Sequence, residues 1–187
     1  MAVVAPEVVG LILEGIKDAA VALGIGIAGA AAADQVQKAR TRSKDLAEAA
    51  PATTCLSCRE GPCAVSAAGM PGQKYNGGAH GFMRLPPGDG LESHHVPAKA
   101  ASPLPEDLGP AIKMDPADHI KTKSWGRSNA ARAYRKTQGE LILSGRSTEA
   151  FMMDVADLKS QFGTKYDRAM EAAWAYLHCL QKNHIIE

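Results

Sequence analysis

The chain has 187 residues, of which 45% are hydrophobic but only 5% aromatic, and its formal net charge is +1. Much of the apolar content is alanine, which buries little area per residue, so we expect a small, helix-rich core in one catalytic-sized domain with an appendage. The near-neutral charge excludes a polycation, and any nucleic-acid surface must therefore come from local clustering of basic residues.

Residues 1–48 are predicted to form an apolar, alanine-rich helical region that serves packing or delivery. Its longest apolar run, residues 19–33, is shorter than the ~20 residues that a bilayer span needs. Charged residues interrupt the preceding hydrophobic stretch and no basic segment comes before it, so we expect no secretory signal peptide and no stable membrane span. A packed helix, a chaperone-covered segment and a conditionally inserting segment stay open as alternatives.

Residues 49–76 are rich in cysteine, proline and glycine, and we expect a linker that contains the stretch "CLSCREGPC". Its C-x2-C-x4-C spacing is typical of a short zinc knuckle, although no fourth ligand follows nearby. The three candidate ligands of this structural zinc are Cys55, Cys58 and Cys63. His80 or Cys179 could supply the fourth ligand across space, and a disulfide or free thiols are the alternatives.

Residues 77–187 are predicted to form the catalytic domain, which begins with loops and short strands. A short extended segment starting at Leu91 carries the adjacent histidines His94 and His95, whose side chains would point to opposite faces of a strand. A second short strand is expected at "AIKM". Asp115 then makes a good N-cap and is followed by a proline, so His119 would lie about one turn into a helix.

Three longer helices are expected after this unit, at about residues 129–143, 147–163 and from residue 164 onward. The second begins at Ser147, a good N-cap residue, and ends at Gly163. The third begins at Thr164, with an acidic residue three positions later as in a capping box. Trp125 is expected to close the strand–strand–helix unit as a core residue.

The order of strand, histidine pair, loop, strand and helix with histidine suits metal-assisted hydrolysis. Two imidazoles can hold a divalent cation, which stabilises the charge that develops on a scissile phosphate. The third can take a proton from water, because an unperturbed imidazole titrates near pH 6.5.

Three segments carry a resemblance to a known family: "GDGLESHHVPAK", "GPAIKMDPADHIKT" and "RAYRKTQ". The region of residues 77–176 resembles the His-His nuclease domains of bacterial polymorphic toxins, in the HNH (ββα-metal, His-Me finger) superfamily, and within it the Ser-His-His group. The resemblance implies an α+β fold, predominantly helical, with a small ββα-metal catalytic core.

The resemblance also implies roles for individual residues. His94 and His119 would be metal ligands, and His95 would be the general base that activates water. Many HNH sites have a further histidine four residues along the helix, where this chain has Lys123. The metal would then keep more waters, or an acidic residue would contribute, while Lys123 would contact a phosphate. The acidic candidates are Glu92 and Asp118.

Basic residues cluster around the proposed site. Residues 113–136 contain seven lysines and arginines against two aspartates, a local charge of +5. Such a patch would attract a phosphate backbone in a salt-dependent way, although a solvated helix face is the common alternative. The candidate nucleic-acid contacts are Lys99, Lys121, Arg127, Arg132 and Arg135. Arg84 is, with Lys123, a candidate for stabilising the transition state.

The leading hypothesis is a metal-dependent endonuclease that uses one divalent ion, either magnesium, manganese, nickel or zinc. By resemblance it would be a DNase toxin effector of interbacterial competition, with a cognate immunity protein and a secretion-apparatus or chaperone partner for its N-terminal region. It would stay in the bacterial cytoplasm before delivery into the cytoplasm of a target cell. The alternatives are a non-catalytic, zinc-stabilised nucleic-acid or protein-binding module, and an RNase with the same site.

Overall fold

A computed structural model describes Arg59 and residues 61–187 of the chain. The N-terminal region expected at residues 1–48, and the cysteines Cys55 and Cys58, lie outside the described residues. The longer elements are α4 (Ala64–Ala68), β1 (Gly77–Ala79), α5 (His80–Met83), β2 (Glu92–His95), β3 (Pro110–Met114), α6 (Pro116–His119), α7 (Asn129–Leu143), α8 (Ser147–Phe162) and α9 (Asp167–Lys182). Two 3-10 turns, η1 (Lys99–Ala101) and η2 (Glu106–Leu108), connect β2 to β3. The mixture of helices with a small sheet confirms the predicted α+β class.

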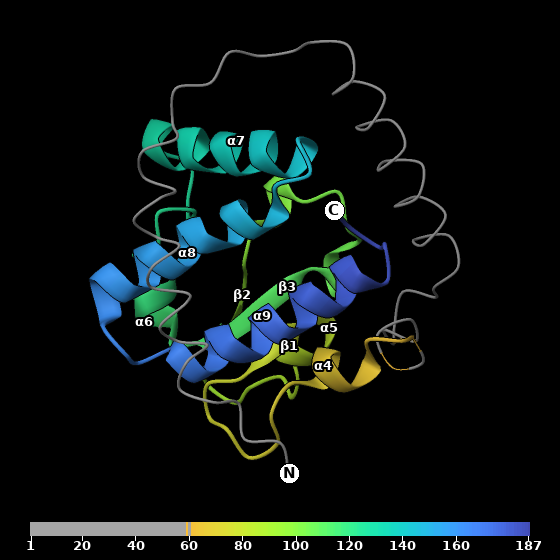
Figure 1. Ribbon diagram of the computed structural model, residues 1–187. Helices are drawn as coiled ribbons and strands as arrows, with labels where there is room; N and C mark the ends of the chain where they lie inside the picture. The colour runs from red at the N-terminus through yellow and green to blue at the C-terminus, as the bar shows by residue number, and fades with distance from the viewer. Residues whose placement is uncertain (1–58, 60) are drawn as a thin grey trace.

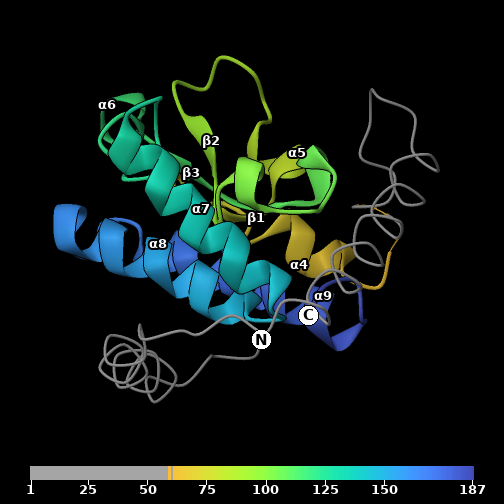
Figure 2. The ribbon, with the colours of Figure 1, turned by 90° about the horizontal axis from the view of Figure 1, so that it is seen from above.

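The sheet is antiparallel, and its strand order is β1-β3-β2, so that β3 lies in the middle. Helix α9 crosses one face of this sheet, whereas α5 lies on the other side (Figure 1). Seen from above, α7 and α8 run close together beside the sheet (Figure 2). Among the helices that the structure describes, none combines the length and the apolar character needed to cross a membrane.

The main core forms between β3, α8 and α9. Ile112 and Met114, two positions apart on β3, point to the same face and are fully buried. They pack against Phe151 and Leu158 of α8 and against Leu177 of α9. This core fixes the position of β3, and therefore of the edge strand β2 that pairs with it.

Two consecutive glycines allow β1 to lie in contact with helices on both sides. A Cβ atom at Gly77 would come within 1.9 Å of the Ala169 carbonyl oxygen in α9. A Cβ atom at Gly78 would come within 2.2 Å of the Ala67 carbonyl oxygen in α4. Glycine within a strand often marks such a close backbone approach, and here it brings the sheet close to α4 and α9.

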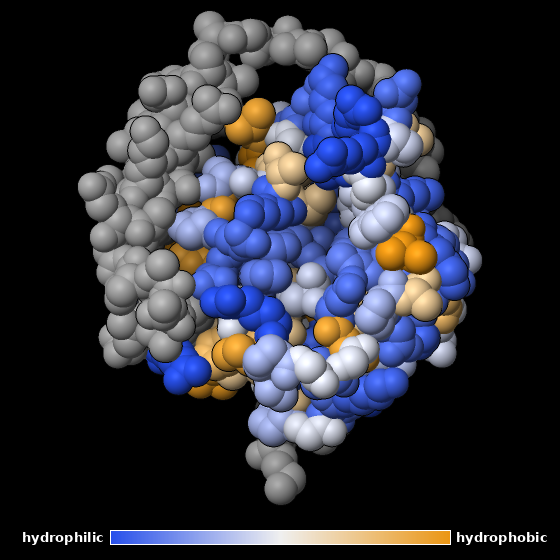
Figure 3. Space-filling view, turned by 180° about the vertical axis from the view of Figure 1, so that it is seen from behind, coloured by the Kyte–Doolittle hydropathy of each residue, from blue (hydrophilic) through white to orange (hydrophobic). Residues whose placement is uncertain are grey.

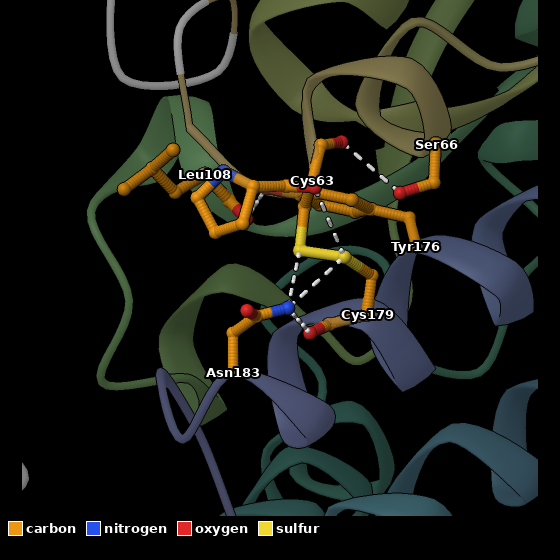
Figure 4. The surroundings of a disulfide bond; sticks show 7 residues. Cys63, Ser66, Leu108, Tyr176, Cys179 and Asn183 are labelled. Carbon is orange, nitrogen blue, oxygen red and sulfur yellow. Dashed lines mark hydrogen bonds between the residues drawn. A yellow bond between two sulfur atoms is a disulfide. The ribbon is translucent and has the colours of Figure 1, made fainter.

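The segment before β1 belongs to the folded domain. Cys63 forms a disulfide with Cys179 of α9, 116 residues later in the sequence (Figure 4). Ala67 of α4 is fully buried in a second cluster with Tyr176 and Leu180 of α9. The described part of the expected linker is thus packed and covalently fastened to the C-terminal helix.

The disulfide corrects the role expected for Cys63. A thiolate is the form of cysteine that binds zinc, and the Cys63 sulfur is instead bonded to that of Cys179. Neither sulfur is therefore a zinc ligand in this oxidised form. The alternative of a disulfide, left open from the sequence, holds for Cys63.

Helix boundaries agree with the predictions at most ends. Helix α7 spans the predicted residues, and the Ser128 side chain caps it by accepting a hydrogen bond from the Ala131 amide at 3.0 Å. Helix α8 also has the predicted span and is followed by Gly163 at a φ of +60°, but its N-cap is Arg146 instead of Ser147. The side chain of Arg146 pairs with Glu149 at 2.9 Å.

Two acidic residues expected at helix starts have other partners. Asp115 is the N-cap residue of α6 as predicted, but its side chain makes no capping hydrogen bond. Its carboxylate instead accepts a hydrogen bond from Tyr75 at 2.7 Å and pairs with Lys165 at 2.6 Å. Helix α9 begins at Asp167, three residues later than predicted. The carboxylate of Asp167 pairs with Lys159 of α8 at 2.6 Å instead of capping its own helix.

Trp125 is not the core residue that the sequence led us to expect, because its side chain is 49% exposed. It lies in the irregular segment between α6 and α7. The space beside Phe151 is occupied by the other tryptophan, Trp174 of α9, with ring centroids 5.3 Å apart.

Candidate active site

Strand β2 separates the predicted site residues onto its two faces. Glu92 and His94 share one face with Met114 and Ile112, their partners on β3. The next residues along the strand, Ser93 and His95, take the opposite face. The division of the two histidines between opposite faces is therefore as predicted, and each face has its own group of polar side chains.

On the first face, His94 meets His119 at the end of α6. Their ring centroids are 4.8 Å apart, and the ring planes are inclined by 69°. His94 is only 4% exposed, whereas His119 is partly open to solvent. The structure thus brings together the two residues predicted to be metal ligands, although they are 25 positions apart in sequence.

The environment of His94 keeps its imidazole neutral. Burial is the main cause that lowers the pKa of His94 to about 3, and charge on His119 or His95 would lower it further. A neutral imidazole has a free nitrogen lone pair, which is the form that binds a metal ion. His94 is therefore in the ligand form at neutral pH.

Glu92 orients the second imidazole. One of its carboxylate oxygens lies 2.5 Å from Nδ1 of His119 and accepts the hydrogen bond from that nitrogen. Nε2 of His119 is then the nitrogen that is left to contact a metal ion. A carboxylate behind a metal-binding histidine is a common arrangement that fixes the tautomer and the ring orientation.

Asp118, the other acidic candidate ligand, is engaged elsewhere. Its carboxylate is bound by Lys165 at 2.6 Å, by the Tyr166 hydroxyl at 2.9 Å and by Lys121 at 3.2 Å. These contacts lower the pKa of Asp118, with Lys165 as the main cause. The side chain fastens α6 to the start of α9 and is not directed to the histidine pair.

The donor set at His94 and His119 suits a divalent ion that takes its remaining ligands from water or substrate. Within residues 61–187, no group of three or more His, Cys, Asp or Glu side chains is arranged so that it could hold a metal ion. The protein would thus offer two imidazole nitrogens, with Glu92 behind one of them. Imidazole suits zinc and nickel better than magnesium or manganese, which prefer oxygen ligands.

On the second face, His95 is held by a backbone carbonyl. Its Nε2 lies 3.0 Å from the carbonyl oxygen of Glu106. Because a carbonyl only accepts hydrogen bonds, Nε2 carries the hydrogen, and Nδ1 keeps a free lone pair. Burial lowers the pKa of His95 from its usual value, so the ring is a neutral acceptor at physiological pH.

His80 and Ser93 complete this second group. The sequence suggested His80 only as a possible fourth ligand of the zinc knuckle and gave Ser93 no role of its own. The His80 ring stacks on His95 with centroids 4.1 Å apart and planes inclined by 20°. Its Nδ1 lies 2.8 Å from the Ser93 hydroxyl oxygen. Ser93 could have been found from its position two residues before His95 on the same strand face, but nothing in the sequence connects His80 with the pair.

His80 is also neutral under ordinary conditions. Burial, followed by the influence of His95, lowers the pKa of His80 to about 4. Glu106 raises it to a smaller extent, because its carboxylate oxygen lies 3.9 Å from Nε2. The contact with Glu106 is therefore one between a carboxylate and a neutral ring, not a salt bridge.

The predicted basic residues have partners within the chain. Arg84 pairs with Asp107 at 3.2 Å, and Lys99 pairs with Glu106. Lys123 lies 3.8 Å from the buried Asp157. Arg132 donates two hydrogen bonds to the Arg127 carbonyl, and Arg135 donates to the carbonyls of Ser124 and Gly126. These arginines hold the segment that precedes α7 in place.

Comparison with known proteins finds no match: no family model, no curated protein and no solved structure is similar to the chain. The side chains on the two faces of β2 are therefore the basis on which its chemistry is assessed.

Proposed function

We propose that this chain is a metal-dependent nuclease that hydrolyses phosphodiester bonds. The observation that carries the proposal is the pair of His94 and His119, 4.8 Å apart, with Glu92 at Nδ1 of His119. The neutral His95 lies next to this pair on the same strand. Two potential ligands and one potential base are what a hydrolytic metal site of this kind requires.

In the proposed reaction, His94 and His119 would hold the divalent ion, which would supply stabilisation of the charge that develops on the phosphate. Nδ1 of His95 takes a proton from a water molecule. The water oxygen then forms a bond to phosphorus, while the bond to the leaving oxygen breaks and this oxygen acquires a proton from solvent. The hydrogen bond from His95 to the Glu106 carbonyl keeps Nδ1 free for this role.

The position of β2 at the edge of the sheet leaves its outer side open. It is an edge strand, and in the described part of the chain no other strand pairs with its outer side. A nucleic-acid strand that lies along this edge would have His94 and His119 on one side and His95 on the other. The side of the molecule opposite to the view of Figure 1 is largely hydrophilic (Figure 3).

DNA is the substrate that we favour, and the role of an interbacterial toxin with a cognate immunity protein follows from the resemblance of "LESHHVPAK" and "MDPADH" to the Ser-His-His group. The proposed phosphate contacts are the exposed cations near the site, with Lys121 and Lys123 directly after α6. Binding would then weaken as the salt concentration rises.

The test is cleavage of plasmid DNA, and in parallel of a structured RNA, by the full chain with magnesium, manganese, nickel or zinc. We expect His95→Ala to lower the rate about 10²- to 10⁴-fold, as for loss of a general base. His119→Ala should also weaken metal binding in calorimetry. His178→Ala, which changes an exposed histidine of α9, is the matched control and should behave as the wild type. Equal cleavage by wild type and His95→Ala, or no cleavage with any metal, would overturn the proposal.

A further inference from the structure

Trp125 is a large apolar side chain that the fold leaves half exposed, 49% by area, close in sequence to His119. Two hydrogen-bonded turns connect the two residues. The Thr122 amide donates to the His119 carbonyl at 3.1 Å, and the Trp125 amide donates to the Thr122 carbonyl at 3.0 Å. Ile120, also in this segment, is 53% exposed. Two large apolar side chains are therefore exposed within six residues of His119 in the sequence.

The backbone around Trp125 is fixed. A single nitrogen of Arg135, Nη1, donates to the carbonyls of Ser124 and Gly126, at 2.5 Å and 2.9 Å. These are the residues immediately before and after Trp125. The amide of Lys123 donates to the buried carboxylate of Asp157 at 2.8 Å. The segment thus presents Trp125 in a defined place, and a preformed contact loses less conformational entropy when a ligand binds.

The surroundings of Trp125 are cationic on the exposed side. The side chains of Lys121 and Lys123 are 58% and 62% exposed, whereas their acidic partners Asp118 and Asp157 are 12% and 2% exposed. The carboxylates therefore face the interior, and the ammonium groups face solvent. Arg127 is exposed as well. An aromatic ring among exposed cations is the combination that binds unpaired nucleic acid, where bases stack on the ring and cations follow the phosphates.

We propose that Trp125 is a base-stacking contact, and that the substrate at the proposed active site is single-stranded or locally unpaired nucleic acid. The inference rests on the proposed nuclease function and specifies the substrate class of that same site. Lys121 and Lys123 lie between His119 and Trp125 in the sequence. With Trp125 stacked on a base, these two lysines would contact the adjoining phosphates. A paired base offers its faces only to its neighbours in the stack, so a duplex would have to open locally.

The test measures binding separately from cleavage, in EDTA. In a Trp174→Phe background Trp125 is the only tryptophan, and its fluorescence reports directly on stacking. The probes are a single-stranded oligothymidylate, an oligouridylate, the oligothymidylate paired with its complement, and an abasic strand of equal length and charge. We expect quenching by both single strands, and affinity for the abasic strand that is lower by about ten- to a hundredfold, the range typical of one stacked base.

The variants separate stacking from charge. Trp125→Ala should lose the preference for base-containing strands, and Trp125→Phe should keep most of it. Lys123→Ala should weaken binding to base-containing and abasic strands alike. Thermal unfolding of each variant checks that the Arg135 contacts still hold the segment.

Equal affinity of the wild type for the abasic and base-containing strands would overturn the inference, as would unchanged binding by Trp125→Ala or equally tight binding of the duplex. Absence of binding to any strand by the folded wild type would overturn it too, and would point to a protein partner for this surface. The nuclease proposal fails separately, when the wild type does not cleave plasmid or RNA with any metal.

Discussion

Asp154 is a buried acid whose ionisation should set part of the pH dependence of stability. It lies in α8 and is 2% exposed. Its carboxyl group accepts hydrogen bonds from the Tyr134 hydroxyl at 3.0 Å and from the Gln138 amide at 2.8 Å, both in α7. Burial is the main cause that raises the pKa of Asp154 to about 7, and the charge of Asp157 acts in the same direction.

The magnitude follows from the difference between the folded and unfolded states. The pKa rises from 3.8 to about 7, so the folded protein keeps a proton that the unfolded chain has already lost over about 3 pH units. At about 1.4 kcal/mol per unit, this amounts to roughly 4 kcal/mol. Because the folded-state pKa is raised, the stabilisation is complete below about pH 4 and is lost as the pH rises to about 7.

The substitution Asp154→Asn removes the titration and keeps the shape of the side chain. We expect the free energies of unfolding of the two proteins, measured in urea, to diverge between pH 4 and pH 8. The free energy of the variant minus that of the wild type should increase by roughly 4 kcal/mol as the pH rises. Ser160→Ala, on the same helix, changes no charge and is the control. A difference between wild type and Asp154→Asn that stays constant over this pH range would refute the reasoning.

Three further results are expected. Cys63→Ser should lower the free energy of unfolding by about 4 to 5 kcal/mol, the value expected for opening a closed loop of about 100 residues. In thermal unfolding, the wild type in reducing agent should have the same midpoint temperature as this variant. Glu92→Gln should weaken metal binding about 10- to 100-fold in calorimetry, and an unchanged affinity would mean that Glu92 does not orient His119. Gly77→Ala should destabilise the fold by about 1 to 3 kcal/mol in urea unfolding, because a methyl group there meets the α9 backbone. Gly139→Ala, where the nearest atom would lie 3.8 Å from the added methyl group, is the control and should not destabilise it.

Local signals predicted the elements near the site well. The span of α7 agrees because Ser128 is a strong N-cap residue and its hydroxyl does cap the helix. The two-residue period of a strand was enough to assign His94 and His95 to opposite faces of β2. The juxtaposition of His94 and His119 was predicted from the order of elements in the "SHH" and "MDPADH" segments, and the structure brings these two rings together.

The features that the sequence did not predict all depend on contacts between distant segments. His80 stacks on His95 only because β1 and β2 both pair with β3. The disulfide requires α4 to reach α9, which no local spacing reveals. The size of Trp125 predicts a core residue, but its side chain is exposed. The exposure follows from the turns around it, which Arg135 of α7 stabilises by donating to the Ser124 carbonyl.

The bond between Cys63 and Cys179 closes a covalent loop that contains β1, β2, β3 and every histidine of the candidate site. A chain with such a loop cannot pass through a narrow pore in single file, because two strands must enter together wherever the loop passes. Reduction of this one disulfide makes the polypeptide linear again. A force applied between the segment before Cys63 and the C-terminus passes through the disulfide to α9, so β1, β2 and β3 bear no load until the two sulfurs separate.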